Sequence, residues 1–85
     1  MKTFLSYSYG DDTTVIHNLL TKNGIEIFDS LKDMQYGNSL QQTIKSAVNN
    51  CDFVFFIYSE MNPHIAFEVG LAVALNKPIF TVLAG

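Results

Sequence analysis

The sequence predicts an α/β fold in which a parallel sheet is covered by helices on both faces. Short apolar runs of β-prone residues alternate along the chain with longer stretches of helical period, and polar or glycine residues separate them. The chain has 85 residues, of which 48% are hydrophobic, so it can form one small domain with an adequate core. We therefore expect a single domain over residues 1–85, with three layers.

The first half of the chain predicts a strand, a helix and a second strand. The strands are Thr3–Tyr7 and Ile25–Phe28, both rich in β-prone residues. The helix begins after polar cap candidates at residues 11–13 and ends at Asn23-Gly24, where glycine permits a left-handed C-cap. Its apolar positions fall at helical spacing: Val15, Ile16, Leu19 and Leu20.

The second half predicts two more helices and two more strands after a long polar loop at residues 31–39. Asn38 or Ser39 caps a helix whose buried stripe is Leu40, Ile44, Ala47 and Val48. The run Phe53–Tyr58 has no alternation, which is typical of a strand buried on both faces at the centre of a sheet. A helix from Pro63 to about Leu75 is apolar nearly all round, and Pro78–Leu83 is the last strand. The elements predict a flavodoxin-like sheet of about four parallel strands in the order 2-1-3-4, with right-handed crossovers.

Polar residues follow the predicted strands where a sheet of this kind binds ligands. They are Ser6, Tyr7 and Ser8 after the first strand, Asp29 and Ser30 after the second, and Ser59 after the third. The carboxyl ends of parallel strands lie at one edge of the sheet, and ligands bind outside that edge at the switch point in strand order. We expect a ligand cleft there.

Composition excludes several classes of function. The net charge is -3 and no basic cluster occurs, which argues against binding to nucleic acid or to anionic membranes. No apolar run approaches the ~20 residues of a membrane span, so we expect a soluble, cytoplasmic protein. One cysteine and two histidines are too few for an internal disulfide or a structural metal site. Cys51 has no activating basic neighbour in sequence and is interpreted as a small buried residue.

Three segments resemble the Toll/interleukin-1 receptor (TIR) domain over nearly the whole chain. They are Phe4-Leu5-Ser6-Tyr7-Ser8, the second strand with its flanks from Gly24 to Asp29, and the loop exit Gly37-x-x-Leu40. The resemblance implies a TIR-like domain that lacks the usual last strand and helix. It also implies self-assembly into a homo-oligomer.

The segment Asn62–Ala72, followed by Ala74–Ile79, resembles TIR-like nucleotide-binding proteins of prokaryotes and nucleoside deoxyribosyltransferases. The shared pattern is E-x-G-x-A followed by a lysine-proline strand start, and both groups act on N-glycosidic bonds. The resemblance implies that Glu68 is the catalytic glutamate with which TIR domains cleave or cyclise NAD. His64 stands where the commoner TIR pattern has tryptophan, so the sequence departs from that pattern at the expected nicotinamide contact.

The residues themselves also single out Glu68. It is the only charged residue between Met61 and Asn76, in a helix that otherwise looks buried. A lone carboxylate in a buried helix needs either a hydrogen-bonding or charged partner or a functional role. The alternative interpretation is that Glu68 is a surface residue near the start of the helix, where the helix dipole stabilises its negative charge. A carboxylate can stabilise the ribose cation that forms when nicotinamide leaves NAD as a neutral pyridine. A purine or pyrimidine leaves as an anion, and would need a second group such as Asp29 to supply a proton.

The other candidate residues have plain structural alternatives. The candidates for substrate binding are Ser6, Tyr7, Asp29, Gly37, Ser59, Asn62 and His64. Asp29 could bond its own turn, Asn62 could be a helix cap, and His64 could face solvent. Gly37 belongs either to an ordinary turn or to a loop that closes over substrate. His17 lies on the polar side of the first predicted helix and is not expected to be functional.

The sequence leaves three functional hypotheses. The first is a TIR-like enzyme that uses NAD as substrate and no other cofactor, in prokaryotic immune or stress signalling, with assembly controlling activity. The second is a non-catalytic module that assembles through the 31–38 loop, the apolar helix and the edge of the strand Ile79–Leu83. The third is deoxyribosyl transfer between bases.

Overall fold

A four-stranded parallel sheet forms the centre of the structure, a computed structural model that describes residues 1–33, 40–60 and 62–83. The elements follow one another as β1 (Lys2–Ser6), α1 (Thr14–Lys22), β2 (Glu26–Asp29), α2 (Leu40–Asn49), β3 (Phe53–Tyr58), α3 (Pro63–Ala74) and β4 (Ile79–Leu83). Each predicted strand and helix is present, and their ends coincide with the predicted ones or differ by two residues at most. Gly37, the cap candidates Asn38 and Ser39, and the side chain of Leu40 lie outside the described part.

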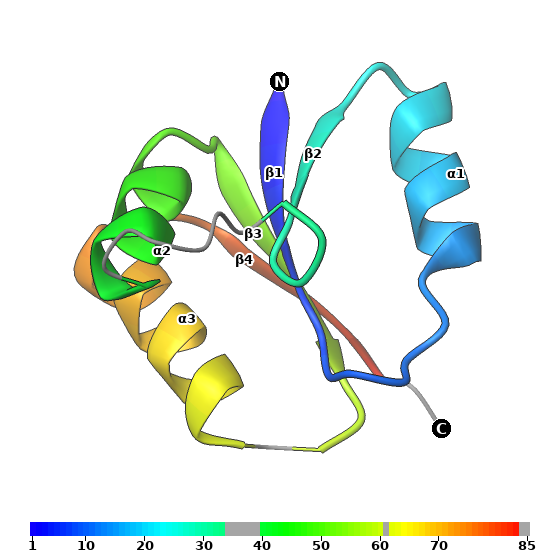
Figure 1. Cartoon of the computed structure of the whole chain (residues 1–85). Coiled ribbons are helices and arrows are strands. Elements are labelled where there is room, and N and C mark those ends of the chain that lie inside the picture. Colours follow the sequence, from blue (N-terminus) through cyan, green and yellow to red (C-terminus); the bar gives the residue numbers. More distant parts are fainter. Residues whose placement is uncertain (34–39, 61, 84–85) are drawn as a thin grey trace.

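The strand order places the helices on opposite faces of the sheet. The strands are hydrogen-bonded in the order β2-β1-β3-β4. The connection from β1 to β2 therefore runs towards one edge of the sheet, and the connections from β2 to β3 and from β3 to β4 run towards the opposite edge. Because crossovers between parallel strands are right-handed, α1 must cover one face, and α2 and α3 the other. Figure 1 shows this arrangement, with α1 alone on one side of the sheet. The predicted three-layer fold and its strand order are confirmed.

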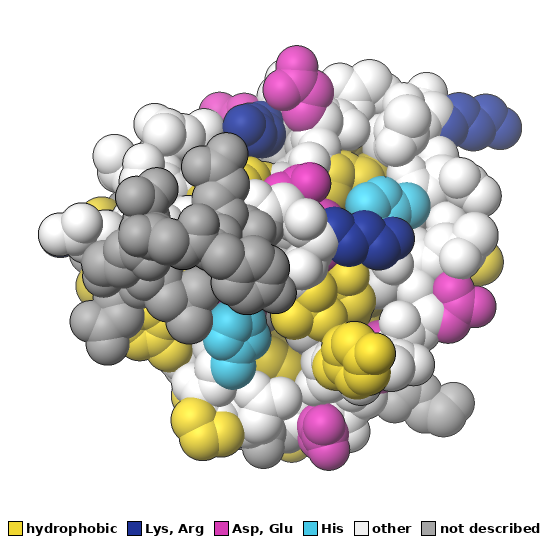
Figure 2. All heavy atoms as spheres, in the orientation of Figure 1, with side chains coloured by type: hydrophobic (Ala, Val, Ile, Leu, Met, Phe, Trp, Pro, Cys, Tyr) yellow, Lys and Arg dark blue, Asp and Glu magenta, His cyan; other side chains and the backbone are white. Residues whose placement is uncertain are grey.

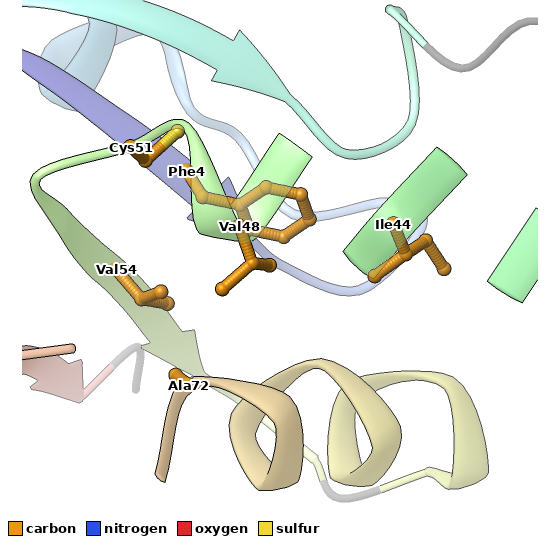
Figure 3. Close-up of a cluster of buried hydrophobic side chains, with 6 residues drawn as sticks. All are labelled: Phe4, Ile44, Val48, Cys51, Val54 and Ala72. Carbon is orange, nitrogen blue, oxygen red and sulfur yellow. The ribbon is translucent and has the colours of Figure 1, made fainter. Parts of the chain in front are cut away.

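The face under α2 and α3 carries the main hydrophobic core (Figure 3). Its buried members are Phe4, Ile44, Val48, Cys51, Val54 and Ala72. Phe4 lies opposite Phe28 on one side and Val54 on the other in the strand register, and the two phenyl rings stack with their centroids 5.5 Å apart. Each large side chain buried in this way stabilises the fold by about 1.5–3 kcal/mol. The predicted stripe of α2 is confirmed at Ile44 and Val48.

The face under α1 is covered less completely. A smaller cluster of Leu5, Tyr7 and Ile57 packs there, with Ile16 partly buried beside it. The expectation that Val15 and Leu19 also face the core is wrong, because α1 lies beside the β2 edge of the sheet and only Leu20 of the helix is fully buried (Figure 1). A single helix about 10 Å wide cannot cover four strands spaced ~4.8 Å apart.

The strand β4 forms an edge of the sheet, since it pairs with β3 alone among the described strands. Phe80 is 54% exposed, although its ring packs edge to face against Phe53 with centroids 5.3 Å apart. Val82 and Leu83 are also exposed. At the amino-terminal end of the sheet an apolar cavity of about 440 Å³ lies between Leu20, Phe53 and Phe80. The α1 face of the β3–β4 pair is therefore an open apolar surface.

Candidate functional site

Glu68 occupies a position of α3 where the helix pattern calls for an apolar side chain. Ile65, Glu68 and Ala72 are spaced i, i+3 and i+7, form the buried stripe of the helix, and are each 0% exposed. Ser6 of β1 donates a hydrogen bond from Oγ to Glu68 Oε1 at 2.6 Å. The fold thus brings together two residues 62 positions apart in the sequence.

The second carboxylate oxygen of Glu68 has no hydrogen bond within the described part of the chain. His64 Nε2 lies 3.0 Å from Glu68 Oε2, at i, i+4 on the same helix, but the alignment makes no hydrogen bond, and both atoms are buried. Burial raises the pKa of Glu68, against the hydrogen bond from Ser6 and the charge of His64, which lower it. Burying an oxygen without a hydrogen bond costs free energy, so the position of this carboxylate makes the folded protein less stable.

His64 separates Glu68 from a hollow at the carboxyl end of the sheet. The hollow has a volume of about 450 Å³, and the described residues that line it are Tyr7, Ser8, Tyr9, Leu31, Asn62, Pro63 and His64. Glu68 is not among the lining residues, although His64 touches both. The expected cleft at the strand ends is therefore present, with the glutamate directly behind its wall.

Asp29 is the centre of a second buried cluster, on the α1 side of the sheet. Its carboxylate accepts hydrogen bonds from Tyr7 Oη at 2.8 Å, from Leu31 N at 3.0 Å and from Lys32 N at 2.9 Å. His17 Nε2 lies 3.0 Å from Asp29 Oδ2, and it carries the proton because an ionised carboxylate only accepts. Burial acts to raise the pKa of Asp29, but the hydrogen bonds together hold it below its ordinary value.

The two clusters lie on opposite faces because Ser6 and Tyr7 are consecutive in an extended segment, where side chains alternate. In Figure 2 histidine side chains (cyan) reach the surface at two separate places, with hydrophobic and Lys or Arg side chains between them. His17, which was expected on the polar side of its helix, is partly buried against Asp29, because β2 supplies a buried carboxylate next to it. No pattern within the helix could indicate that partner.

The remaining candidates have structural partners. Asn62 caps α3 by accepting a hydrogen bond from Ile65 N at 2.9 Å, and its side-chain amide donates to Ser8 Oγ at 3.3 Å. Ser59 is exposed and donates to Asp11 Oδ2 at 2.9 Å, which joins the end of β3 to the loop after β1. Asn62 thus reaches the hollow as well as the helix, whereas Ser59 lies at its margin. Gly37 lies outside the described residues, and so does most of the predicted 31–38 assembly loop.

From the sequence, His64 is a candidate for substrate binding, with a solvent-facing position as the alternative. The structure places it between solvent and Glu68. Its side chain is 36% exposed, while its Nε2 atom is buried. The i, i+4 spacing of His64 and Glu68 was a signal for this contact, because side chains four residues apart on a helix are neighbours.

Other reactive groups offer no competing site in the described part of the chain. Burial raises the pKa of the Cys51 thiol to about 11, so it is protonated at neutral pH, as expected of a core residue. Within residues 1–33, 40–60 and 62–83, no three histidine, cysteine or acidic residues gather closely enough to hold a metal ion. No helix in those ranges is long and apolar enough to cross a membrane.

Comparison with known proteins identifies the fold. No protein-family model matches the sequence, and a search of curated proteins finds no match. Among solved structures, the chain is similar to the TIR domains of the activated Roq1 resistosome, which directly recognises the pathogen effector XopQ. The TM-score is 0.70 and the identity 20%, over 96% of this chain and 56% of that one. It is also similar to the Clostridium botulinum CMP N-glycosidase BcmB, with a TM-score of 0.72 and 19% identity over 98% of this chain and 71% of that one.

The fold is thus one that TIR domains share with an N-glycosidase. At these identities the likeness concerns the fold alone. The chain spans little more than half the length of the Roq1 chain.

Proposed function

We propose that this chain binds a nucleotide and cleaves the bond between ribose and its nitrogen leaving group, with Glu68 as the catalytic carboxylate and NAD as the first substrate to test. One observation carries the proposal. Glu68 is fully buried directly behind the wall of a hollow at the carboxyl ends of the strands, and one of its oxygens has no hydrogen bond from any described residue. A carboxylate kept in this state is ready to act on a positive charge.

The chemistry fits a ribosyl cation. When the C1′–N bond of NAD breaks, the electron pair goes to the nitrogen, nicotinamide leaves as a neutral molecule, and positive charge develops on the ribose. Glu68 stabilises that charge or captures C1′ covalently, and water then adds at C1′ and releases a proton. Ser6 holds the carboxylate through Oε1, so that Oε2 remains for the reacting sugar.

The shared fold supports the proposal, since one similar structure is an N-glycosidase of CMP. The other is a TIR domain within a resistosome, and it supports a role in prokaryotic immune or stress signalling with activity controlled by assembly. The signalling role and the control of activity by assembly are parts of this proposal, and they are tested separately from catalysis.

The decisive experiment incubates the purified protein with NAD over a range of protein concentrations and follows free nicotinamide. Wild type releases nicotinamide, and Glu68→Gln reduces the rate at least a hundredfold. Glu60→Gln is the matched control, because Glu60 is an exposed glutamate three residues before α3. Equal release by wild type and Glu68→Gln contradicts catalysis by Glu68.

A second candidate function is self-assembly without catalysis. The edge strand β4 and the exposed side chains Phe80, Val82 and Leu83 favour it, because unpaired strand edges with apolar side chains tend to pair with another chain. Sedimentation at increasing concentration tests it. Phe80→Lys is expected to shift the protein towards monomer, whereas Val15→Lys, at an exposed apolar position of α1, is the control. A protein that stays monomeric at high concentration removes this candidate.

A further inference from the structure

The position of His64 between Glu68 and the hollow bears on the leaving group. Its side chain is 36% exposed and lines the hollow, while its Nε2 is buried 3.0 Å from Glu68 Oε2. Since Nε2 is buried against Glu68, Nδ1 is the ring nitrogen that we assign to proton exchange with a ligand. One imidazole thus touches the catalytic carboxylate and the space where a leaving group would lie.

The chemistry of the leaving group decides whether a proton donor is needed. Nicotinamide leaves NAD as a neutral pyridine and needs no proton. An uncharged purine or pyrimidine takes the electron pair of the C1′–N bond and leaves as an anion unless an acid protonates it. A site that cleaves only NAD therefore needs no proton donor beside its carboxylate.

The other acidic groups near the hollow are unsuitable donors. Asp29 lies on the opposite face of the sheet, and its hydrogen bonds from Tyr7, His17, Leu31 and Lys32 keep it ionised. Tyr7 lines the hollow, but its hydroxyl already donates to Asp29, and burial together with that carboxylate raises its pKa. Among the described residues that line the hollow, His64 is the one whose side chain also lies against Glu68.

Resting on the proposed function, we propose that His64 protonates the departing base, and that the substrates therefore include nucleosides or nucleoside monophosphates with an uncharged purine or pyrimidine. The C1′–N bond breaks with its electron pair going to the base nitrogen. The imidazolium of His64 gives that nitrogen its proton, while Glu68 stabilises the cation at C1′. Water then adds at C1′, and the proton it loses restores the imidazolium.

The surroundings of His64 suit this cycle. The i, i+4 spacing holds its ring against Glu68, the charged group that faces it from α3 itself. From β1 and the loop after it, Tyr7 and Tyr9 line the same hollow, and no charged side chain from another element is among the described lining residues. His64 thus faces Glu68 on one side and the hollow on the other.

The test compares two kinds of leaving group, neutral nicotinamide and an uncharged base, in three proteins. Rates are measured for nicotinamide release from NAD and for base release from CMP and AMP, with wild type, His64→Ala and Glu68→Gln. Glu68→Gln lowers all rates, because Glu68 acts on the ribosyl cation common to the three reactions. His64→Ala lowers release of cytosine and adenine at least a hundredfold more than release of nicotinamide.

Two results overturn the inference without touching the proposed function. Either wild type releases nicotinamide but no uncharged base, or His64→Ala lowers all three rates by the same factor, which would make His64 a positioning residue for Glu68. If Glu68→Gln leaves every rate unaltered, or wild type cleaves no substrate, the proposed function itself fails. His64→Gln, which keeps a polar side chain, and urea unfolding of each variant separate loss of the acid from loss of the fold.

Discussion

Two buried carboxylates flank the end of β1, each beside a histidine, and they are in opposite states. Asp29 accepts hydrogen bonds from two side chains, through Tyr7 and His17, and from two backbone amides. Among the described residues, Glu68 accepts one, from Ser6, and its other oxygen faces His64 without a hydrogen bond. The pKa of Asp29 is lowered and that of Glu68 is raised.

The difference separates a carboxylate with several hydrogen-bond donors from one with few among the described residues. Burial by itself would raise the pKa of either group, so the number and direction of the donors decide the outcome. At Asp29 the donors join β1, β2, α1 and the turn after β2, which stabilises the fold. At Glu68 the described hydrogen-bond donors are too few to offset the cost of burying the carboxylate. A positively charged ligand could reduce that cost.

The largest expected effect is on stability. Asp29→Ala removes the acceptor of four donors and should lower the free energy of unfolding by about 3 kcal/mol or more. Glu68→Gln keeps the shape, removes the cost of burying a charge, and should leave that free energy within about 1 kcal/mol of wild type or raise it. Urea unfolding followed by circular dichroism measures both. A Glu68→Gln protein as unstable as Asp29→Ala would mean that the two clusters are alike.

The two carboxylates should also give opposite dependences of stability on pH. Glu68 has a raised pKa, so its stabilisation is complete below its ordinary value of 4.5 and is lost as pH rises above it. Asp29 has a lowered pKa, so its stabilisation is present above its ordinary value of 3.8 and is lost as pH falls below it. Each slope can reach about 1.4 kcal/mol per pH unit. Urea unfolding at a series of pH values should show the first slope vanish in Glu68→Gln and the second in Asp29→Asn.

Replacing two buried serines, Ser6 and Ser30, should have smaller effects on stability that differ between the two sites. Ser6 Oγ donates to Glu68, whereas Ser30 Oγ is buried with no hydrogen-bond partner among the described residues. Ser6→Ala should cost about 1 kcal/mol and raise the pKa of Glu68 further, because the lost hydrogen bond lowers it. Ser30→Ala should be neutral or stabilising. Unfolding midpoints in urea rank the two variants, and a larger loss for Ser30→Ala contradicts the assignment.

The smallest effects concern the two histidines. His17 is partly exposed and bonded to Asp29, so His17→Ala should lower the free energy of unfolding by about 0.5–1 kcal/mol near neutral pH. His64 makes no hydrogen bond with Glu68, and His64→Ala should change that free energy by less than His17→Ala. Thermal unfolding of both proteins in one buffer makes the comparison. The reverse order would show that His64 serves the fold more than the site.

Much of this fold could be predicted because local patterns agree with one another. The unbroken apolar run Phe53–Tyr58 indicated a central strand, and it pairs with β1 on one side and β4 on the other. Asn62-Pro63 indicated a helix start, and Asn62 caps α3. Glu68 could be selected because a single charge in an apolar helix is conspicuous. Val15 and Leu19 could not be placed, since helical spacing says nothing about how many strands a helix covers.

What the sequence determined by itself is the order of the elements, the handedness of their connections and the presence of one conspicuous acidic side chain in the apolar helix α3. These properties follow from the hydrophobic period of each segment, from the turn residues and from the chirality of the backbone, all of which act over a few neighbouring residues. Only the tertiary structure decided that Ser6 meets Glu68, that His17 meets Asp29, and that the two carboxylates titrate in opposite directions. The state of a buried charge depends on donors from distant segments, and their alignment exists only once the sheet has formed.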